Sequence, residues 1–254
     1  MKFDYKGMQI FIKDDYEAVS KKAAQLIGAQ VTLNPKSILG LATGSSPEGM
    51  YKNLVEMYKN DIIDFSDVVT FNLDEYLSLP PNNEQSYAYY MNKHLFNHIN
   101  ISRQNIYIPS GIDKNIEKTC SDYDKSIFEY KKIDLQILGI GTNGHIGFNE
   151  PDVHFEAGTH LVNLDQKTIE ANSRFFDDIN DVPKQAISMG IRNIMQSKKV
   201  VLIATGESKI EAINKMLFEE ITPNLPASIL QVHNDFTLIV DKVIGDSIKG
   251  KLFW

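Results

Sequence analysis

Short apolar runs alternate with longer segments of helical periodicity along most of this chain, and this alternation constrains its fold more than any other feature. The apolar runs span residues 37–42, 68–73, 106–108, 135–141, 199–205, 228–232 and 236–240. Segments with helical character span residues 14–29, 47–59, 86–99, 116–130 and 208–218. Strands that are apolar throughout are typical of parallel sheets covered by helices on both faces. We therefore predict a single-domain, three-layer α/β/α Rossmann-like fold over residues 1–254, with a mainly parallel central sheet.

The composition of the chain narrows its possible functions. Its 254 residues carry a net charge of −7 without a basic stripe, so we expect no nucleic-acid partner. The N-terminus lacks the apolar core of a signal peptide, and no apolar run is long enough to span a membrane. Cys120 is the only cysteine, which excludes an internal disulfide and suits a reducing compartment. We expect a cytoplasmic protein with no membrane partner.

Metal and serine-hydrolase motifs are weak or missing. His94 and His98 have the spacing of one helix face, but the glutamate of an HExxH motif is absent, and we interpret them as surface or packing residues. No Gly-x-Ser-x-Gly elbow occurs. We predict no metal site.

Four polar segments follow predicted strands and are candidates for the functional site. They are residues 43–47, 74–76, 141–151 and 205–209. In open parallel sheets, ligands bind beyond the carboxyl ends of the strands. We expect these four segments to converge on one site.

The segment Thr43-Gly44-Ser45-Ser46-Pro47 precedes a predicted helix and has the character of an anion site. Backbone N–H groups and the positive end of the helix dipole favour a phosphate at such a position. The alternative is a plain serine N-cap. Arg174 and Lys209 are candidate countercharges, although each alone is more often a solvated surface residue.

Two adjacent carboxylates, Asp74 and Glu75, stand at the end of an apolar run. Adjacent strand residues point to opposite faces, so a dyad that shares one proton is not expected. One carboxylate can face the site while the other bonds within the fold. The alternative is a pair of solvated loop acids.

The stretch LGIGTNGHIGFNEP, residues 138–151, contains the G-x-G-x-x-G fingerprint of dinucleotide-binding folds. That fingerprint requires a following helix, and HIGFNEP is a poor helix former, so we disfavour NAD. The glycines instead allow Asn143, His145 and Glu150 to face one point. Histidine is the usual acid–base group near neutral pH, and an amide or carboxylate can fix its tautomer. The alternative is a buried histidine bonded to a loop carbonyl.

Taken together, these segments resemble the glucosamine-6-phosphate deaminase family from about residue 39 to residue 233. The markers are LGLATGSSPEGMY, FNLDEYLSLP, GIGTNGHIGFNEP, ANSRFF, VPKQAISMG and TGESK. The resemblance implies that glucosamine 6-phosphate and water become fructose 6-phosphate and ammonia, without a metal or redox cofactor.

The resemblance also implies roles for individual residues. His145 would help to open the sugar ring, Asp74 would move a proton from C2 to C1 through an enolamine, and Glu150 would orient His145. The phosphate would bind among residues 43–46, Arg174 and Lys209. Residues from about 164 to 186 would form a mobile lid that excludes water.

Two departures from the family pattern bear on mechanism and regulation. Asn143 stands where some members have an aspartate, so it can orient His145 but cannot supply charge, which Glu150 then has to provide. His160 and Val162 stand where allosteric hexameric members carry an arginine and a lysine. We predict that N-acetylglucosamine 6-phosphate does not activate the protein, and that it is a monomer or a small homo-oligomer.

Two rival functions remain open at this point. One is the same chemistry on galactosamine 6-phosphate, because the sequence does not reveal which side chain reads the epimeric hydroxyl. The other is a non-catalytic sugar-phosphate sensor, which the acidic chain and the lack of a helix-turn-helix segment disfavour.

Overall fold

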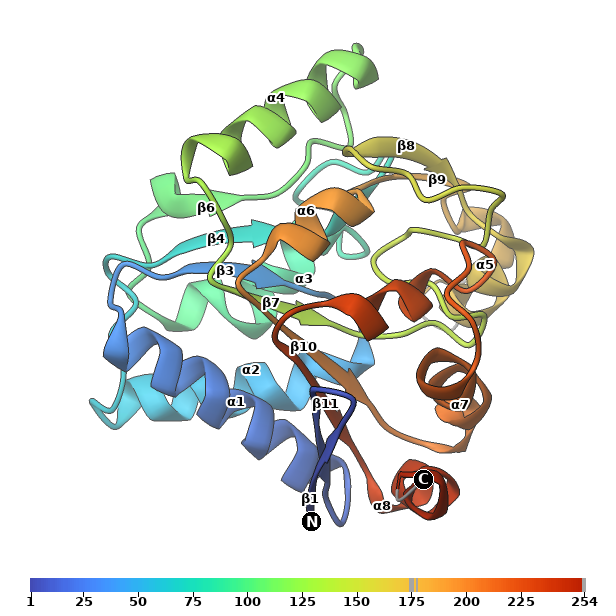
Figure 1. Cartoon of the computed structure of the whole chain (residues 1–254). Coiled ribbons are helices and arrows are strands. Elements are labelled where there is room, and N and C mark those ends of the chain that lie inside the picture. The colour runs from blue at the N-terminus through green and yellow to red at the C-terminus, as the bar shows by residue number, and fades with distance from the viewer. Residues whose placement is uncertain (174–175, 177, 253–254) are drawn as a thin grey trace.

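The computed structural model, which describes residues 1–173, 176 and 178–252, is built around an eight-stranded sheet (Figure 1). The strand order is β1-β2-β11-β10-β7-β3-β4-β6. The strands are β1 (Lys2–Tyr5), β2 (Met8–Ile12), β3 (Ile38–Leu41), β4 (Val69–Asn72), β6 (Ile106–Tyr107), β7 (Leu135–Leu138), β10 (Lys199–Ala204) and β11 (Phe236–Val240). All neighbours pair in parallel except β1 and β2. The prediction of a mainly parallel sheet is confirmed, and the N-terminal hairpin is an addition to it.

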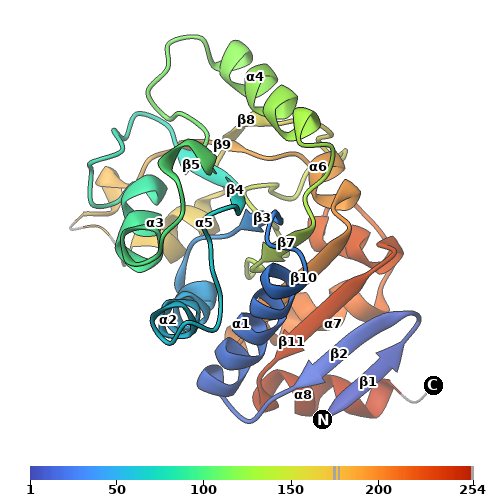
Figure 2. The ribbon, with the colours of Figure 1, turned by 90° about the vertical axis from the view of Figure 1, so that its left-hand side faces the viewer.

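Helices cover both faces of this sheet. The helices are α1 (Tyr16–Leu33), α2 (Ser45–Lys59), α3 (Tyr87–His94), α4 (Ile116–Glu129), α5 (Gln166–Asn172), α6 (Ile191–Gln196), α7 (Ile210–Phe218) and α8 (Lys242–Ile248). The connections through α1, α2 and α3 run in one direction across the sheet, and those through α4, α6 and α7 run back. Right-handed crossovers therefore put the two sets on opposite faces, as Figures 1 and 2 show.

The direction of the connections reverses between the adjacent strands β3 and β7. From β3 the chain moves through α2 towards β4, whereas from β7 it moves through α6 towards β10. The strands that flank such a reversal open a crevice at their carboxyl ends, where ligands bind in this class of fold. The loops after β3 and β7 are therefore the expected walls of the site.

A second, three-stranded antiparallel sheet stands beside the first. Its order is β5 (Asp74–Tyr76), β9 (Gln185–Ser188) and β8 (His160–Asn163), and β9 pairs with both neighbours. A separate small apolar cluster, with Tyr76 and Phe148 among its members, supports it. Residues 74–76, predicted as a loop, form a strand because β9, far along the chain, pairs with them.

Two further secondary-structure predictions were wrong. Residues 228–232, predicted as a strand, lie in a 3-10 helix (Pro226–Val232), because Pro226 at its start presets a helical φ. The helix predicted over 86–99 ends at His94, since Leu95 adopts φ −139°, and His98 belongs to a separate 3-10 turn (Phe96–His98). His94 and His98 therefore do not share a helix face.

Within the described part of the chain, no helix combines the length and apolarity needed to cross a membrane.

Candidate active site

One pocket of about 150 Å³ lies at the carboxyl ends of β3 and β7, where the direction of the connections reverses. Residues from all four predicted segments line it. Its lining includes Thr43, Gly44, Ser45, Ser46, Asp74, Gly141, His145 and Lys209. A larger cavity of about 1350 Å³ lies beside α4 and contains none of these residues. The convergence expected from the sequence is therefore present, and the chemistry-bearing side chains gather in the smaller cavity.

Residues 43–47, the candidate anion site, run into the first turn of α2. Gly44 is the N-cap residue with φ +95°, and no side chain caps the helix. The serine N-cap alternative is therefore wrong, because Ser45 and Ser46 already lie inside the helix. This 15-residue helix presents the positive end of its dipole to the pocket. Lys209, from a 3-10 turn (Glu207–Lys209) after β10, lines the same pocket, whereas Arg174 lies outside the described residues.

The two adjacent carboxylates have opposite surroundings. Asp74 is 5% exposed and lines the pocket. Glu75 is 3% exposed and accepts hydrogen bonds from the backbone N–H groups of Tyr76, Tyr87 and Ala88 at 2.9 Å each. Glu75 thereby caps the first turn of α3, while Asp74 is left to the site. The alternative of two solvated loop acids is wrong.

Burial sets the protonation of this pair. Burial, with a smaller contribution from the neighbouring Glu75, raises the pKa of Asp74 to about 8. Burial also raises the pKa of Glu75 to about 7, although its three N–H donors oppose the shift. A carboxyl group whose pKa lies near neutrality can both take up and release a proton under physiological conditions.

His145 lines the same pocket, and Asn143 and Glu150 are hydrogen-bonded to it from the same loop. His145 Nδ1 lies 3.1 Å from Glu150 Oε2, and Asn143 Nδ2 donates to the same oxygen at 2.7 Å. Asn143 Oδ1 also accepts from the His145 backbone N–H at 3.2 Å. The partner of the imidazole is thus a carboxylate, and the alternative of a loop carbonyl is wrong.

The glycines of this segment make room for the histidine. A Cβ at Gly141 would lie 2.5 Å from the His145 ring. Gly144 adopts φ +87°, and a Cβ there would lie 2.2 Å from Leu225 Cδ1. Residues 139–150 form turns instead of the helix that a dinucleotide fingerprint needs. Gly141 is therefore explained by the close approach of the His145 ring, and Gly144 by its positive φ and by Leu225.

Glu150 is an ionised group despite its burial. Burial acts to raise its pKa, but the hydrogen bond and charge of His145, with hydrogen bonds from Thr168 and Asn143, outweigh it and lower the pKa. The negative charge beside His145 therefore resides on Glu150, since Asn143 is neutral.

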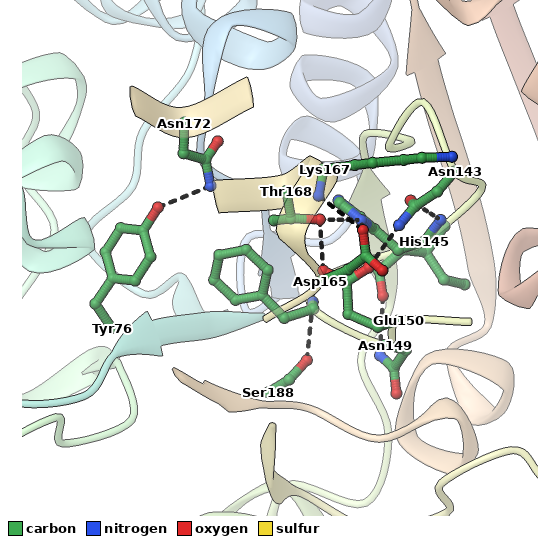
Figure 3. A network of polar contacts seen from close by, with 12 residues as sticks. Tyr76, Asn143, His145, Asn149, Glu150, Asp165, Lys167, Thr168, Asn172 and Ser188 are labelled. Atoms are coloured by element: carbon green, nitrogen blue, oxygen red, sulfur yellow. Dashed lines mark hydrogen bonds and ion pairs between the residues drawn. The ribbon is translucent and has the colours of Figure 1, made fainter. Parts of the chain in front are cut away.

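The structure adds residues that the sequence analysis missed. Lys167, Thr168 and Asn172 from α5, and Tyr87 from α3, also line the pocket. Thr168 Oγ1 donates to Glu150 Oε1 at 2.6 Å, and Asn172 Nδ2 donates to Tyr76 Oη at 2.8 Å (Figure 3). The only sequence signal for α5 was Asp165, its N-cap, because a helix of seven residues has little periodicity to detect.

The loop of residues 139–150, which carries His145, is also hydrogen-bonded to β9 of the small sheet and to the residue after it. Ser188 Oγ accepts from the Phe148 backbone N–H at 3.0 Å, and Asn149 Nδ2 donates to Met189 O at 2.9 Å. Asp74 pairs with Ser188 across β5 and β9. The strand that carries Asp74 and the loop that carries His145 are thus held by the same strand, β9.

Comparisons with known proteins agree with this geometry. Residues 13–239 match the family described as glucosamine-6-phosphate isomerases/6-phosphogluconolactonase. Glucosamine-6-phosphate deaminases of Clostridium botulinum strains Loch Maree and Langeland are 57% and 55% identical over 244 residues, which are 96% of this chain and 100% of each relative.

Solved structures show the same relationship. A monomeric glucosamine-6-phosphate deaminase superposes with a TM-score of 0.92 at 39% identity, over 94% of this chain and 99% of that one. A 6-phosphogluconolactonase from Thermotoga maritima reaches a TM-score of 0.72 at 21% identity, over 92% of this chain and 100% of that one, a likeness of fold alone.

Proposed function

The chain belongs to the family of glucosamine-6-phosphate isomerases and 6-phosphogluconolactonases, and we propose that its pocket performs the deaminase reaction of that family. The protein converts glucosamine 6-phosphate and water into fructose 6-phosphate and ammonia. One observation carries the assignment of the site. A buried carboxylate with a pKa of about 8, Asp74, lines the same pocket as a histidine bonded to an ionised glutamate.

The phosphate group binds at the start of α2. Ser45 and Ser46 lie in the first turn of that helix, and Lys209 supplies a positive charge from the other side. Arg174 is assigned to the same role on the strength of the ANSRFF motif alone. This anchoring fixes the sugar so that its C1 and C2 atoms lie between Asp74 and His145.

His145 opens the sugar ring. Its Nδ1 is engaged by Glu150, so Nε2 is the nitrogen left for the substrate. A proton leaves the C1 hydroxyl through Nε2 and is returned to the ring oxygen, which gives the open-chain aldehyde. The ionised Glu150 stabilises the imidazolium that forms in between, and Asn143 holds the loop in place by its hydrogen bonds.

Asp74 then carries out the isomerisation. Its carboxylate takes the C2 proton while one ammonium proton passes to the aldehyde oxygen, which gives a neutral enolamine, and the C2 proton is then delivered to C1. The nitrogen on C2 becomes an iminium. Water adds to C2 to give a carbinolamine, which releases ammonia and leaves the C2 ketone. Because Asp74 is buried, it is a stronger base than a solvated carboxylate and can serve both proton transfers.

Residues 164–186 act as a lid over this reaction. The pocket volume of about 150 Å³ is below the roughly 300–1,000 Å³ of most ligand pockets. The segment that closes it includes α5, whose Thr168 and Asn172 line the pocket. Outward movement of α5 admits the sugar phosphate, and its return excludes water during proton transfer.

We also propose how the protein is regulated, how it assembles and where it is located. A relative described as monomeric superposes along nearly the full chain, so we assign a monomer or small homo-oligomer. His160 and Val162 lie on β8 and offer no pair of fixed cations to an anionic activator, so N-acetylglucosamine 6-phosphate leaves the half-saturation concentration unchanged. Cys120 is a free buried thiol, which suits the cytoplasm.

The decisive experiment is ammonia release by the purified protein on glucosamine 6-phosphate, with fructose 6-phosphate followed in parallel. We expect equal appearance of both products in the presence of EDTA and without NAD. Failure with this substrate but release from galactosamine 6-phosphate would reassign the epimer. Failure with both, together with retained binding, would replace the enzyme by a sugar-phosphate sensor.

A further inference from the structure

Thr168 is a buried hydroxyl that reaches the acid–base pair from α5. Its side chain is 4% exposed, and Oγ1 lies 2.6 Å from Glu150 Oε1 and 3.4 Å from His145 Nδ1. A threonine in a helix usually bonds to a backbone carbonyl of its own preceding turn. Thr168 instead bonds across the pocket to a loop that precedes α5 in the chain, as Figure 3 shows.

The hydrogen bonds around Glu150 leave its carboxylate one orientation. Asn143 and His145 both contact Oε2, and Thr168 alone among the described residues donates to Oε1. A hydroxyl has one proton, so Thr168, having given it to Glu150, can only accept from His145 Nδ1–H. Both contacts of Nδ1 therefore favour the tautomer in which Nδ1 carries the proton and Nε2 is free to act as a base.

Two polar contacts, one helical turn apart, hold α5 over the pocket. Thr168 bonds to Glu150, and Asn172 bonds to Tyr76. The first contact touches the acid–base pair, whereas the second joins α5 to β5 without touching it. The second contact is therefore a matched reference for the first, because its removal takes away one of the two contacts of α5 while Thr168 still holds the helix against Glu150.

We propose that Thr168 is a positioning residue that couples closure of α5 to assembly of the His145–Glu150 pair. With α5 withdrawn, Glu150 Oε1 loses its donor and the carboxylate is free to turn away from the imidazole. With α5 in place, the carboxylate is fixed and His145 Nε2 is ready to open the ring. His145 can therefore act as a base on the sugar only when α5 has closed the pocket. The proposal rests on the reaction assigned above and adds to it the link between closure and chemistry.

The test compares three variants with the wild type. Thr168→Val removes the hydroxyl at nearly constant shape, and Thr168→Ser restores a hydroxyl. Tyr76→Phe removes the hydroxyl that bonds to Asn172 and to the Tyr87 side chain, and leaves the contact of Thr168 with Glu150 in place. The readouts are kcat, KM and the pH profile with glucosamine 6-phosphate, and ¹⁵N-resolved NMR of the His145 ring in the enzyme without substrate. Thermal melting of each variant reports whether it is folded.

Thr168→Val is expected to lower kcat about 10–100-fold, as for other residues that orient a functional histidine, and to change KM much less. The pH profile should have a second, more acidic limb, below that of Asp74, which reports the protonation of Glu150. This acidic limb should move to higher pH, because Glu150 loses a donor that lowers its pKa. The His145 Nδ1 proton should exchange faster with water. Thr168→Ser should recover most of kcat, and Tyr76→Phe should raise KM while kcat, the acidic limb and the Nδ1 signal stay as in the wild type.

Several results would overturn the proposal. A Thr168→Val variant with wild-type kcat and pH profile would do so, and so would a loss of kcat without any change at Nδ1. If Thr168→Val does not fold, Thr168→Ala in its place is held to the same outcomes. The NMR measurement does not require turnover. If the wild type were inactive on the amino sugar, the proposed reaction would be wrong, but the NMR data would still show whether Thr168 positions His145.

Discussion

Asp74, which lines the pocket, and Glu150, which contacts the pocket residue His145, are two buried carboxylates of opposite character. None of the hydrogen bonds within the described part of the chain ends on the Asp74 carboxylate, and burial raises its pKa to about 8. Glu150 accepts hydrogen bonds from Asn143, His145 and Thr168, which overcome burial and lower its pKa.

The difference shows how one pocket obtains two functions from one type of side chain. Burial without donors yields a group that exchanges its proton near neutral pH. Burial with donors and a neighbouring imidazole yields a fixed negative charge. A proton shuttle needs the first property, and a residue that orients and stabilises His145 needs the second.

The largest expected effect follows from removing the exchangeable proton. Asp74→Asn should lower kcat by about 10²–10⁴-fold, the usual contribution of a general acid–base group, while the sugar phosphate still binds. Steady-state assays and isothermal titration would measure the two quantities. Asp152→Asn, which removes an exposed carboxylate, is the control and should keep wild-type kinetics. A wild-type rate in Asp74→Asn would remove Asp74 from the mechanism.

A smaller effect is expected at the fixed charge. Glu150→Gln keeps the shape of the side chain but removes the anion beside His145, and we expect kcat to fall about 10–100-fold. The measurement is kcat at saturating substrate. An effect as large as that of Asp74→Asn would mean that Glu150 itself transfers a proton. The two carboxylates would then not differ in function.

The sequence predicted the surroundings of His145 better than the surroundings of Asp74. His145, Asn143 and Glu150 lie within eight residues, so a local motif was enough to group them. Asp74 lies on β5, which pairs with β9 far along the chain, where Ser188 is its partner. The first turn of α3 binds the neighbouring Glu75. Burial of this kind is a tertiary property, and the sequence left solvated acids open as an alternative.

The parts of the fold that were missed share one physical origin. The runs that became β3, β4, β7, β10 and β11 are buried on both faces and could be recognised from composition alone. The short strands of the small sheet and the seven-residue α5 gain their stability from neighbours distant in sequence. Thr168 was missed for the same reason, because its partner Glu150 is 18 positions away.

The pH dependence of the wild type separates the two carboxylates without mutation. Asp74 acts as a base only when deprotonated, so kcat/KM should rise with pH, up to about tenfold per unit below the pKa of about 8, and level off above it. Glu150, with its lowered pKa, stays ionised throughout this range and adds no limb near neutral pH. A profile that is flat from pH 6 to pH 9 would contradict the raised pKa of Asp74.

The smallest effect is on stability, and its sign is opposite to the effect on activity. The pKa of Asp74 is raised in the folded protein, so between pH about 4 and about 8 the folded state holds a proton that the unfolded state has lost. Stability therefore falls as pH rises through this window, by at most about 1.4 kcal/mol per pKa unit of difference. Asp74→Asn removes this penalty, and its Tm should exceed that of the wild type at pH 9 but not at pH 4.

Asp152→Asn again serves as the control, because an exposed carboxylate should give the same Tm difference at both pH values. A pH-independent difference for Asp74→Asn would mean that Asp74 is not held at a raised pKa in the folded state. A gain confined to high pH would mean that the proton shuttle is kept at a cost in stability, as expected for a buried carboxylate without donors. The hydrogen-bond donors around Glu150 remove that cost for the second carboxylate, which has to remain ionised and does not have to exchange its proton.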